Sequence, residues 1–236
     1  MTLPYDPARA AVELDEATKS FSTRRLEFIQ RHMRDIGIAA HERTAKWDQI
    51  PEAVRKALPT EWRGFGLSGS FGIGKTFALV AAIHRHAEEA VDRRMEEAIR
   101  KGDRWVLREG LSFTPWPLWV NWPGESAARR AQLFQNEHRE VEAWIIRLQD
   151  PGRLLILDDL GADSTTAKDW TGEVLARVID ERLRREAVTV WTSNLDTKGL
   201  VDRYGPRTFS RLQALAPAIQ LPKMPDLRLV PERRTS

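Results

Sequence analysis

The chain has 236 residues, of which 42% are hydrophobic and 30% charged, an ordinary globular composition for one or at most two domains. It has no cysteine, which excludes disulfides and thiolate zinc sites, and no apolar run of the roughly 18 residues that a membrane helix needs. The 37 basic and 34 acidic residues give a net charge of +3, evenly spread, which permits nucleic-acid binding without indicating it. We therefore expect a soluble, cytoplasmic protein with no membrane partner.

Residues 1–58 are predicted to form a small helical region. Beyond Ser22, which can cap a helix, apolar residues recur at helical spacing, at Leu26, Ile29, Met33 and Ile36. A second short helix is expected from Pro51 to Leu58, with Pro51 in its first turn, and Pro59 breaks the chain after it. We accordingly expect a first region at 1–58 and a second domain at 59–236.

From residue 59 onward the chain alternates between short apolar stretches and helical stretches. Strands are expected at 64–68, 118–122, 153–158, 187–193 and 218–221, and helices near 75–100, 125–149, 169–185 and 197–213. Trp119 lies in the middle of one expected strand and is predicted to be a core residue. The alternation predicts an α/β fold with a parallel sheet sandwiched by helices.

A glycine-rich turn between the first strand and the first long helix matches the pattern G-x-x-x-x-G-K-[ST] of phosphate loops. Glycines let such a backbone wrap around phosphate oxygens, while the lysine reaches the β- and γ-phosphates and the hydroxyl binds Mg²⁺. The motif predicts a site for ATP and Mg²⁺ formed by Gly69, Ser70, Phe71, Gly72, Ile73, Gly74, Lys75 and Thr76.

Two later strands also end in polar side chains. Asp158 and Asp159 follow an apolar run, where one carboxylate can hold Mg²⁺ and the next can orient an attacking water. Asn194 follows the β-branched stretch that begins at Ala187. The carboxyl ends of parallel strands are where α/β folds bind ligands, so these residues are expected near the phosphate loop.

The ordered set GSFGIGKT, LLILDDLGAD, VTVWTSNLD, YGPRTFSRL and DLR resembles the AAA+ ATPases of the DnaC and DnaI helicase-loader type, and the IstB-type transposition ATPases share much of it. The resemblance covers about residues 59–230 and implies a P-loop NTPase (AAA+) fold. It implies that Asp158 is the Mg²⁺-site acid, Asp159 the catalytic acid and Asn194 the sensor of the γ-phosphate.

The same resemblance implies roles for two arginines in the fourth motif. Arg211 matches the arginine finger that acts on the nucleotide of a neighbouring subunit, and Arg207 matches a neighbouring basic residue; four positions apart on a helix, they share one face. Only 25 residues follow Arg211, so we expect no C-terminal lid domain, and Arg228 is a candidate for a role at the nucleotide.

These features favour an ATP-dependent, DnaC-like loader of a replicative DNA helicase. It would bind the helicase through residues 1–58, contact single-stranded DNA and assemble into an ATP-dependent homo-oligomer. Because Asp159 is one methylene shorter than the glutamate of many AAA+ proteins, slow, switch-like hydrolysis is expected. An IstB-like ATPase that acts with a transposase on duplex DNA, a small-molecule P-loop kinase and a non-hydrolysing adaptor remain as alternatives.

Overall fold

The computed structural model describes residues 45–59, 64–101, 117–163 and 168–222, together with residues 12, 15, 16, 19, 31, 33, 34 and 38. The chain divides into two compact units, Met1–Trp47 with Val80–Thr114 and Asp48–Leu79 with Pro115–Ser236. The predicted boundary after residue 58 stays a prediction, since most of residues 1–44 lie outside the described part. Among the described residues, no helix combines the length and the apolar character needed to cross a bilayer.

The first unit contributes most of helix α3 (Lys75–Lys101), from Val80 onward. Met33 and Ile38 of this unit are buried, whereas Val12 is exposed. The guanidinium of Arg85 lies 4.8 Å from the centroid of the Trp47 ring, a cation–π contact within this unit.

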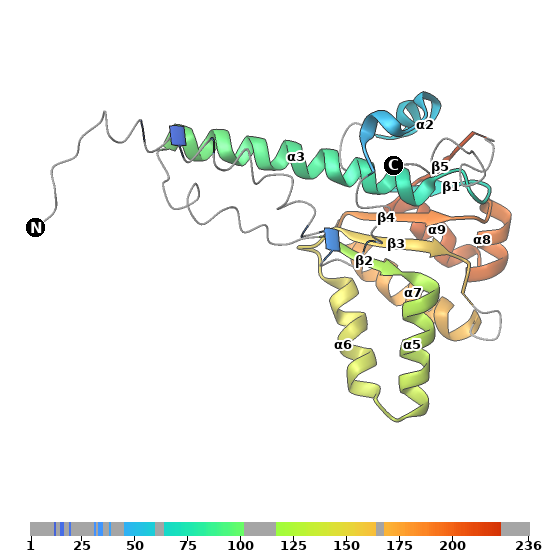
Figure 1. Ribbon diagram of the computed structural model, residues 1–236. Helices are drawn as coiled ribbons and strands as arrows, with labels where there is room; N and C mark the ends of the chain where they lie inside the picture. Colours follow the sequence, from blue (N-terminus) through green and yellow to red (C-terminus); the bar gives the residue numbers. More distant parts are fainter. Residues whose placement is uncertain are drawn as a thin grey trace, which may run out of the picture. The chain divides into compact units, whose positions relative to one another are not determined.

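The second unit is built on a five-stranded parallel sheet (Figure 1). The strands are β1 (Phe65–Ser68), β2 (Leu118–Asn121), β3 (Leu155–Leu160), β4 (Thr189–Ser193) and β5 (Ala218–Gln220), in the order β2-β3-β4-β1-β5. All four pairings are parallel, as the alternation of strands and helices predicted. Strand β1, which precedes the glycine-rich turn, therefore has a neighbour on each side.

The helices of this unit begin and end close to the predicted positions. They are α2 (Glu52–Ala57), α5 (Trp122–Phe134), α6 (His138–Gln149), α7 (Lys168–Arg184), α8 (Thr197–Tyr204) and α9 (Pro206–Leu215), with the 3-10 helix η1 (Trp47–Gln49) before them. Pro51 immediately precedes α2 instead of lying in its first turn. Figure 1 shows α5 and α6 as neighbouring helices joined by a short turn, and α7 packs on α6, α8 and α9.

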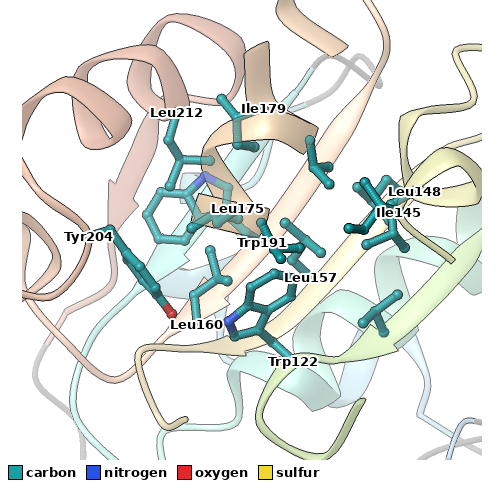
Figure 2. Packing of buried hydrophobic residues seen from close by; sticks show 14 of the residues in the cluster. Trp122, Ile145, Leu148, Leu157, Leu160, Leu175, Ile179, Trp191, Tyr204 and Leu212 are labelled. Atoms are coloured by element: carbon teal, nitrogen blue, oxygen red, sulfur yellow. The ribbon is translucent and has the colours of Figure 1, made fainter. Parts of the chain in front are cut away.

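One face of the sheet is covered by a hydrophobic core from β2, β3, β4 and helices α5 to α9 (Figure 2). Leu118 and Val120 of β2 belong to this core. Successive side chains of a strand point to opposite faces, so Trp119, between them, points away from this core. It is only half-buried. The prediction that Trp119 is a core residue is therefore wrong. Trp122, the first residue of α5, is fully buried and stacks on Trp144 with ring centroids 6.2 Å apart.

The indole of Trp191 on β4 lies across the backbone of its cross-strand partner, Gly66 on β1. Trp191 is fully buried, and its Nε1 donates a hydrogen bond of 2.9 Å to the carbonyl of Ala216. A Cβ added at Gly66 would lie 1.9 Å from Cε2 of this indole. Glycine at position 66 is therefore required by the close approach of the ring.

The buried side chain of Arg182 connects the segments that lead into β3 and β4. The guanidinium of Arg182, on α7, is fully buried and donates to the Thr189 hydroxyl at 2.8 Å. It also donates to four backbone carbonyls, those of Leu148, Asp150, Arg153 and Val188, at 2.7–2.9 Å. Burial lowers the pKa of Arg182 to about 10, so the group remains a cation at neutral pH.

Candidate nucleotide-binding site

The loop between β1 and α3 has the backbone conformation of a phosphate-binding turn. Gly72 and Gly74 have φ of 74° and 79°, in the left-handed region that residues with a side chain rarely adopt. Helix α3 begins at Lys75, directly after the last of these glycines. The loop and the start of the helix thus give the arrangement that binds phosphate in other proteins, with the positive end of the helix dipole at the turn.

The three side-chain-bearing positions between the glycines differ in exposure. Ser70 is exposed, and its carbonyl accepts a hydrogen bond from Lys75. Phe71 is 68% exposed, whereas Ile73 is buried and its Cδ1 would lie 2.6 Å from a Cβ at Gly69. The Ile73 side chain therefore packs inside the loop. Of the predicted loop residues, Ile73 is the one that can contact a phosphate only through its backbone.

Lys75 is buried within the loop that it belongs to. Its Nζ donates to the carbonyls of Gly69 and Ser70, both at 2.9 Å, and to Oδ1 of Asn194 at 2.6 Å. The last bond connects the phosphate loop to the end of β4. An ammonium group has three donors, so Lys75 has to exchange at least one of these bonds to reach a phosphate oxygen.

Asp158, on β3, faces the start of α3. Asp158 is 5% exposed, and the hydroxyl of Thr76 lies 3.2 Å from its Oδ1. A carboxylate beside a hydroxyl, next to a phosphate-binding turn, is a set of hard oxygen donors of the kind that Mg²⁺ prefers. The residues predicted to hold the metal are thus neighbours, and their chemistry fits it.

Asp159 stands next to Asp158 in an unusual backbone conformation. Its φ is 61°, although it carries a side chain, and strained residues of this kind are concentrated at functional sites. Its Oδ1 accepts a hydrogen bond of 3.1 Å from Nδ2 of Asn194. Asn194 therefore joins Lys75 to Asp159, and the three predicted residues form one hydrogen-bonded chain.

The two arginines predicted to act on a neighbouring subunit lie on α9. Arg211 forms an ion pair with Asp180 of α7, both side chains being partly exposed, and Arg207 is exposed. Within the described part of the chain, no hydrogen bond joins either arginine to the phosphate loop, so their role as finger residues stays a prediction. Arg228 lies outside the described residues.

Thr192, on β4 and two residues before Asn194, is a site residue that was not predicted from the sequence. Its hydroxyl donates to Oδ1 of Asp158 at 2.6 Å and accepts the backbone N–H of Asp159 at 2.9 Å. A hydroxyl residue near the end of the strand that precedes Asn194 was the available signal. The pairing of β3 with β4 that brings it to the acids cannot be read from the sequence.

A second missed group lies just beyond the acids and consists of Asp163, Thr171, Arg203 and Tyr204. The Tyr204 hydroxyl donates to Oδ1 of Asp163 at 2.7 Å and accepts the N–H of Gly161 at 2.8 Å. Thr171 donates to the other carboxylate oxygen at 2.7 Å, and Arg203 forms a buried ion pair with it. This group, called the Asp163 cluster below, connects the segment after β3 to α7 and α8.

The charges within the Asp163 cluster are set by these contacts. Burial raises the pKa of the Asp163 carboxyl, but the hydrogen bonds from Arg203, Tyr204 and Thr171 outweigh burial and hold it below its usual value. Burial also raises the pKa of the Tyr204 hydroxyl, and the adjacent carboxylate raises it further. Asp163 is thus an anion and Tyr204 a neutral donor at neutral pH.

No family model matches the chain. The replicative helicase loader DnaI of Bacillus subtilis (strain 168) is 23% identical over 189 residues, which are 77% of this chain. The chain spans about half of that relative, 51% of its length.

Two solved structures have a similar fold. A crystal structure of DnaI has a TM-score of 0.52 and 20% identity over 80% of this chain and 94% of that one. A proposed primosome component from Streptococcus pyogenes serotype M3 has a TM-score of 0.51 and 21% identity over 79% of this chain and 90% of that one. The chain therefore has the P-loop AAA+ fold of the DnaC/DnaI-type helicase loaders and resembles DnaI in sequence.

Proposed function

We propose that this chain is an ATPase that loads a replicative DNA helicase onto single-stranded DNA. The observation that carries the proposal is the meeting of Lys75, Thr76, Asp158, Asp159 and Asn194 at the carboxyl ends of β1, β3 and β4. This constellation has a group for each need of ATP hydrolysis, namely phosphate binding, metal binding and orientation of water. The likeness to DnaI gives the class of partner.

The site residues divide the work of binding and hydrolysis. The loop from Gly69 to Gly74 binds the phosphates, and Lys75 exchanges a carbonyl partner for a phosphate oxygen. Thr76 and Asp158 would hold Mg²⁺, which supplies Lewis-acid stabilisation of the transferring phosphoryl group when bound. The carboxylate of Asp159 orients the attacking water, and Asn194 fixes that carboxylate through its Nδ2.

The arginines of α9 are proposed to act between subunits. Arg211 lies in a partly exposed ion pair with Asp180, and such pairs contribute only about 0–1 kcal/mol, so a more favourable anion can displace the carboxylate. The γ-phosphate of a neighbouring subunit is such an anion, and an arginine finger contributes about 10³–10⁵ in rate. Arg207, exposed one turn earlier, would support the same contact. Assembly would then depend on ATP.

The partners are proposed from the same likeness. Residues 1–58 would bind the helicase, and the AAA+ domain would bind single-stranded DNA. The net charge is only +3 and the charges are evenly spread, so the chain has no long basic segment. A positively charged path for DNA would therefore require several subunits side by side.

The proposal is tested by measuring ATP hydrolysis with no DNA, with single-stranded DNA and with duplex DNA. We expect slow hydrolysis that single-stranded DNA stimulates, together with ATP-dependent capture of a purified replicative helicase. Lys75→Ala removes nucleotide binding, whereas Asp159→Asn retains binding and loses turnover. Phosphoryl transfer to a small acceptor would replace the proposal with a kinase, and stimulation by duplex DNA alone would favour a transposition ATPase.

A further inference from the structure

An irregularity in the sheet sets the two acids apart from the rest of β3. Leu157 pairs with Trp191 and Leu160 pairs with Ser193, so three steps along β3 correspond to two steps along β4. The additional residue forms a bulge at Asp158 and Asp159, and the positive φ of Asp159 lies within it. Thr192 is the residue of β4 that faces this bulge.

The hydroxyl of Thr192 forms hydrogen bonds with both acids. It donates to Oδ1 of Asp158 at 2.6 Å and accepts the backbone N–H of Asp159 at 2.9 Å, and the residue is fully buried. A hydroxyl can donate and accept at the same time, which no aliphatic side chain of similar shape can do. The donated bond ends on a carboxylate oxygen of the proposed metal site.

The same carboxylate oxygen also faces the start of α3. Oδ1 of Asp158 lies 3.2 Å from the hydroxyl of Thr76, so Thr76 on one side and Thr192 on the other bracket it. The accepted bond acts on the second acid, because it holds the backbone of Asp159 in the conformation from which its side chain reaches Asn194. One hydroxyl thus fixes the rotamer of one acid and the backbone of the other.

We propose that Thr192 is the positioning residue of the metal site, orienting Asp158 towards Mg²⁺ and holding Asp159 in the bulge. The inference rests on the proposed function, since it assigns a role in the same site. Thr192 reaches the substrate through the two aspartates. Partners that orient metal-binding carboxylates are typically worth about 10- to 100-fold in metal affinity or activity.

The test compares Thr192→Val and Thr192→Ala, which remove the hydroxyl, with Thr192→Ser, which retains it. The matched control is Ser193→Ala, which removes the neighbouring buried hydroxyl. That hydroxyl donates to the carbonyl of Leu160 and accepts the N–H of Leu195, and it bonds to neither aspartate. Binding of a fluorescent ATP analogue is titrated with Mg²⁺ and repeated in EDTA. Thermal unfolding without nucleotide establishes that each variant is folded, and kcat and KM are measured at saturating Mg²⁺.

We expect Thr192→Val and Thr192→Ala to raise the Mg²⁺ concentration at half-maximal binding about tenfold or more. Binding in EDTA should stay as in the wild type, because the phosphate loop is intact, and kcat should fall more than KM rises. Thr192→Ser should restore the wild-type titration, and Ser193→Ala should retain it.

The inference alone would be overturned by a wild-type Mg²⁺ titration in both hydroxyl-free variants, or by a Thr192→Ser variant as impaired as they are. An equal loss of binding in EDTA would also overturn it, since that loss reports general damage to the domain. A wild-type chain that binds no nucleotide would overturn the proposed function and this inference with it.

Discussion

Replacement of Gly66 by alanine tests the packing of the sheet against its core. The added Cβ would lie 1.9 Å from Cε2 and 2.1 Å from Cζ2 of the Trp191 indole, well inside van der Waals contact. Trp191 has no exposed surface, and its Nε1 is bonded to the carbonyl of Ala216, so the ring cannot move without losing that bond.

The expected cost follows from these contacts. Forcing additional atoms into a packed core costs about 1–3 kcal/mol. Loss of the indole hydrogen bond costs about 1 kcal/mol more. We therefore expect Gly66→Ala to lower the free energy of unfolding by about 2–4 kcal/mol.

The measurement is urea-induced unfolding followed by circular dichroism, with Gly172→Ala as the matched control. Gly172 lies within α7, and a Cβ added there meets nothing within 4 Å. The same substitution should therefore stabilise the protein at this position, by about 0.5–1 kcal/mol.

A double-mutant cycle isolates the contact. In a Trp191→Leu background the atoms that clash are gone, so most of the cost of Gly66→Ala should disappear. A Gly66→Ala variant as stable as the wild type would refute the reasoning, as would an undiminished cost in the Trp191→Leu background.

Three further measurements address the buried charges and the arginine of α9. Arg182→Met should lower the free energy of unfolding by about 4 kcal/mol or more, because four carbonyls lose a buried donor, each worth about 1–3 kcal/mol; a shift of less than 1 kcal/mol in urea would contradict this. The folded-state pKa of Asp163 lies below its ordinary 3.8, so its contribution is present above about pH 4 and is lost as the pH falls through the folded-state value. Asp163→Asn should therefore destabilise strongly at pH 7 and progressively less as the pH falls below 3.8, and a difference that stays constant over this range would argue against an ionised Asp163. Arg211→Ala should lower ATP hydrolysis by about 10³-fold or more and regain part of it when mixed with Lys75→Ala subunits, which supply the arginine; no recovery on mixing would argue against action between subunits.

The phosphate loop and the two acids could be predicted from the sequence because their signals are local. Glycine spacing defines the turn, and an apolar run that ends in Asp158 and Asp159 indicates a strand leading to the site. The bulge shifts the end of that strand: β3 was expected to end at residue 158 and ends at Leu160, so both acids lie within it.

Contacts between distant segments could not be predicted in the same way. Thr192 serves Asp158 and Asp159 only because β4 lies beside β3, and the sequence does not state which strands are neighbours. Arg182 resembled any other charged residue of a helix, although it is fully buried, because its partners come from two separate stretches of chain, 148–153 and 188–189. The fold class could be predicted from the alternation of elements, whereas the residues that fix its register could not.

The five hydrogen bonds of Arg182 make one end of the sheet more rigid than the other. They join α6, α7 and the segments that enter β3 and β4, all at the edge remote from the acids. At the opposite edge, β3 and β4 are joined around a bulge by separate side-chain contacts of Thr192, Ser193 and Asn194. Any displacement of β3 and β4 that accompanies a change of ligand should therefore be smallest near Arg182 and should grow towards Asn194. Hydrogen exchange should accordingly be slowest at the amides where β3 and β4 begin and faster at those where the strands end.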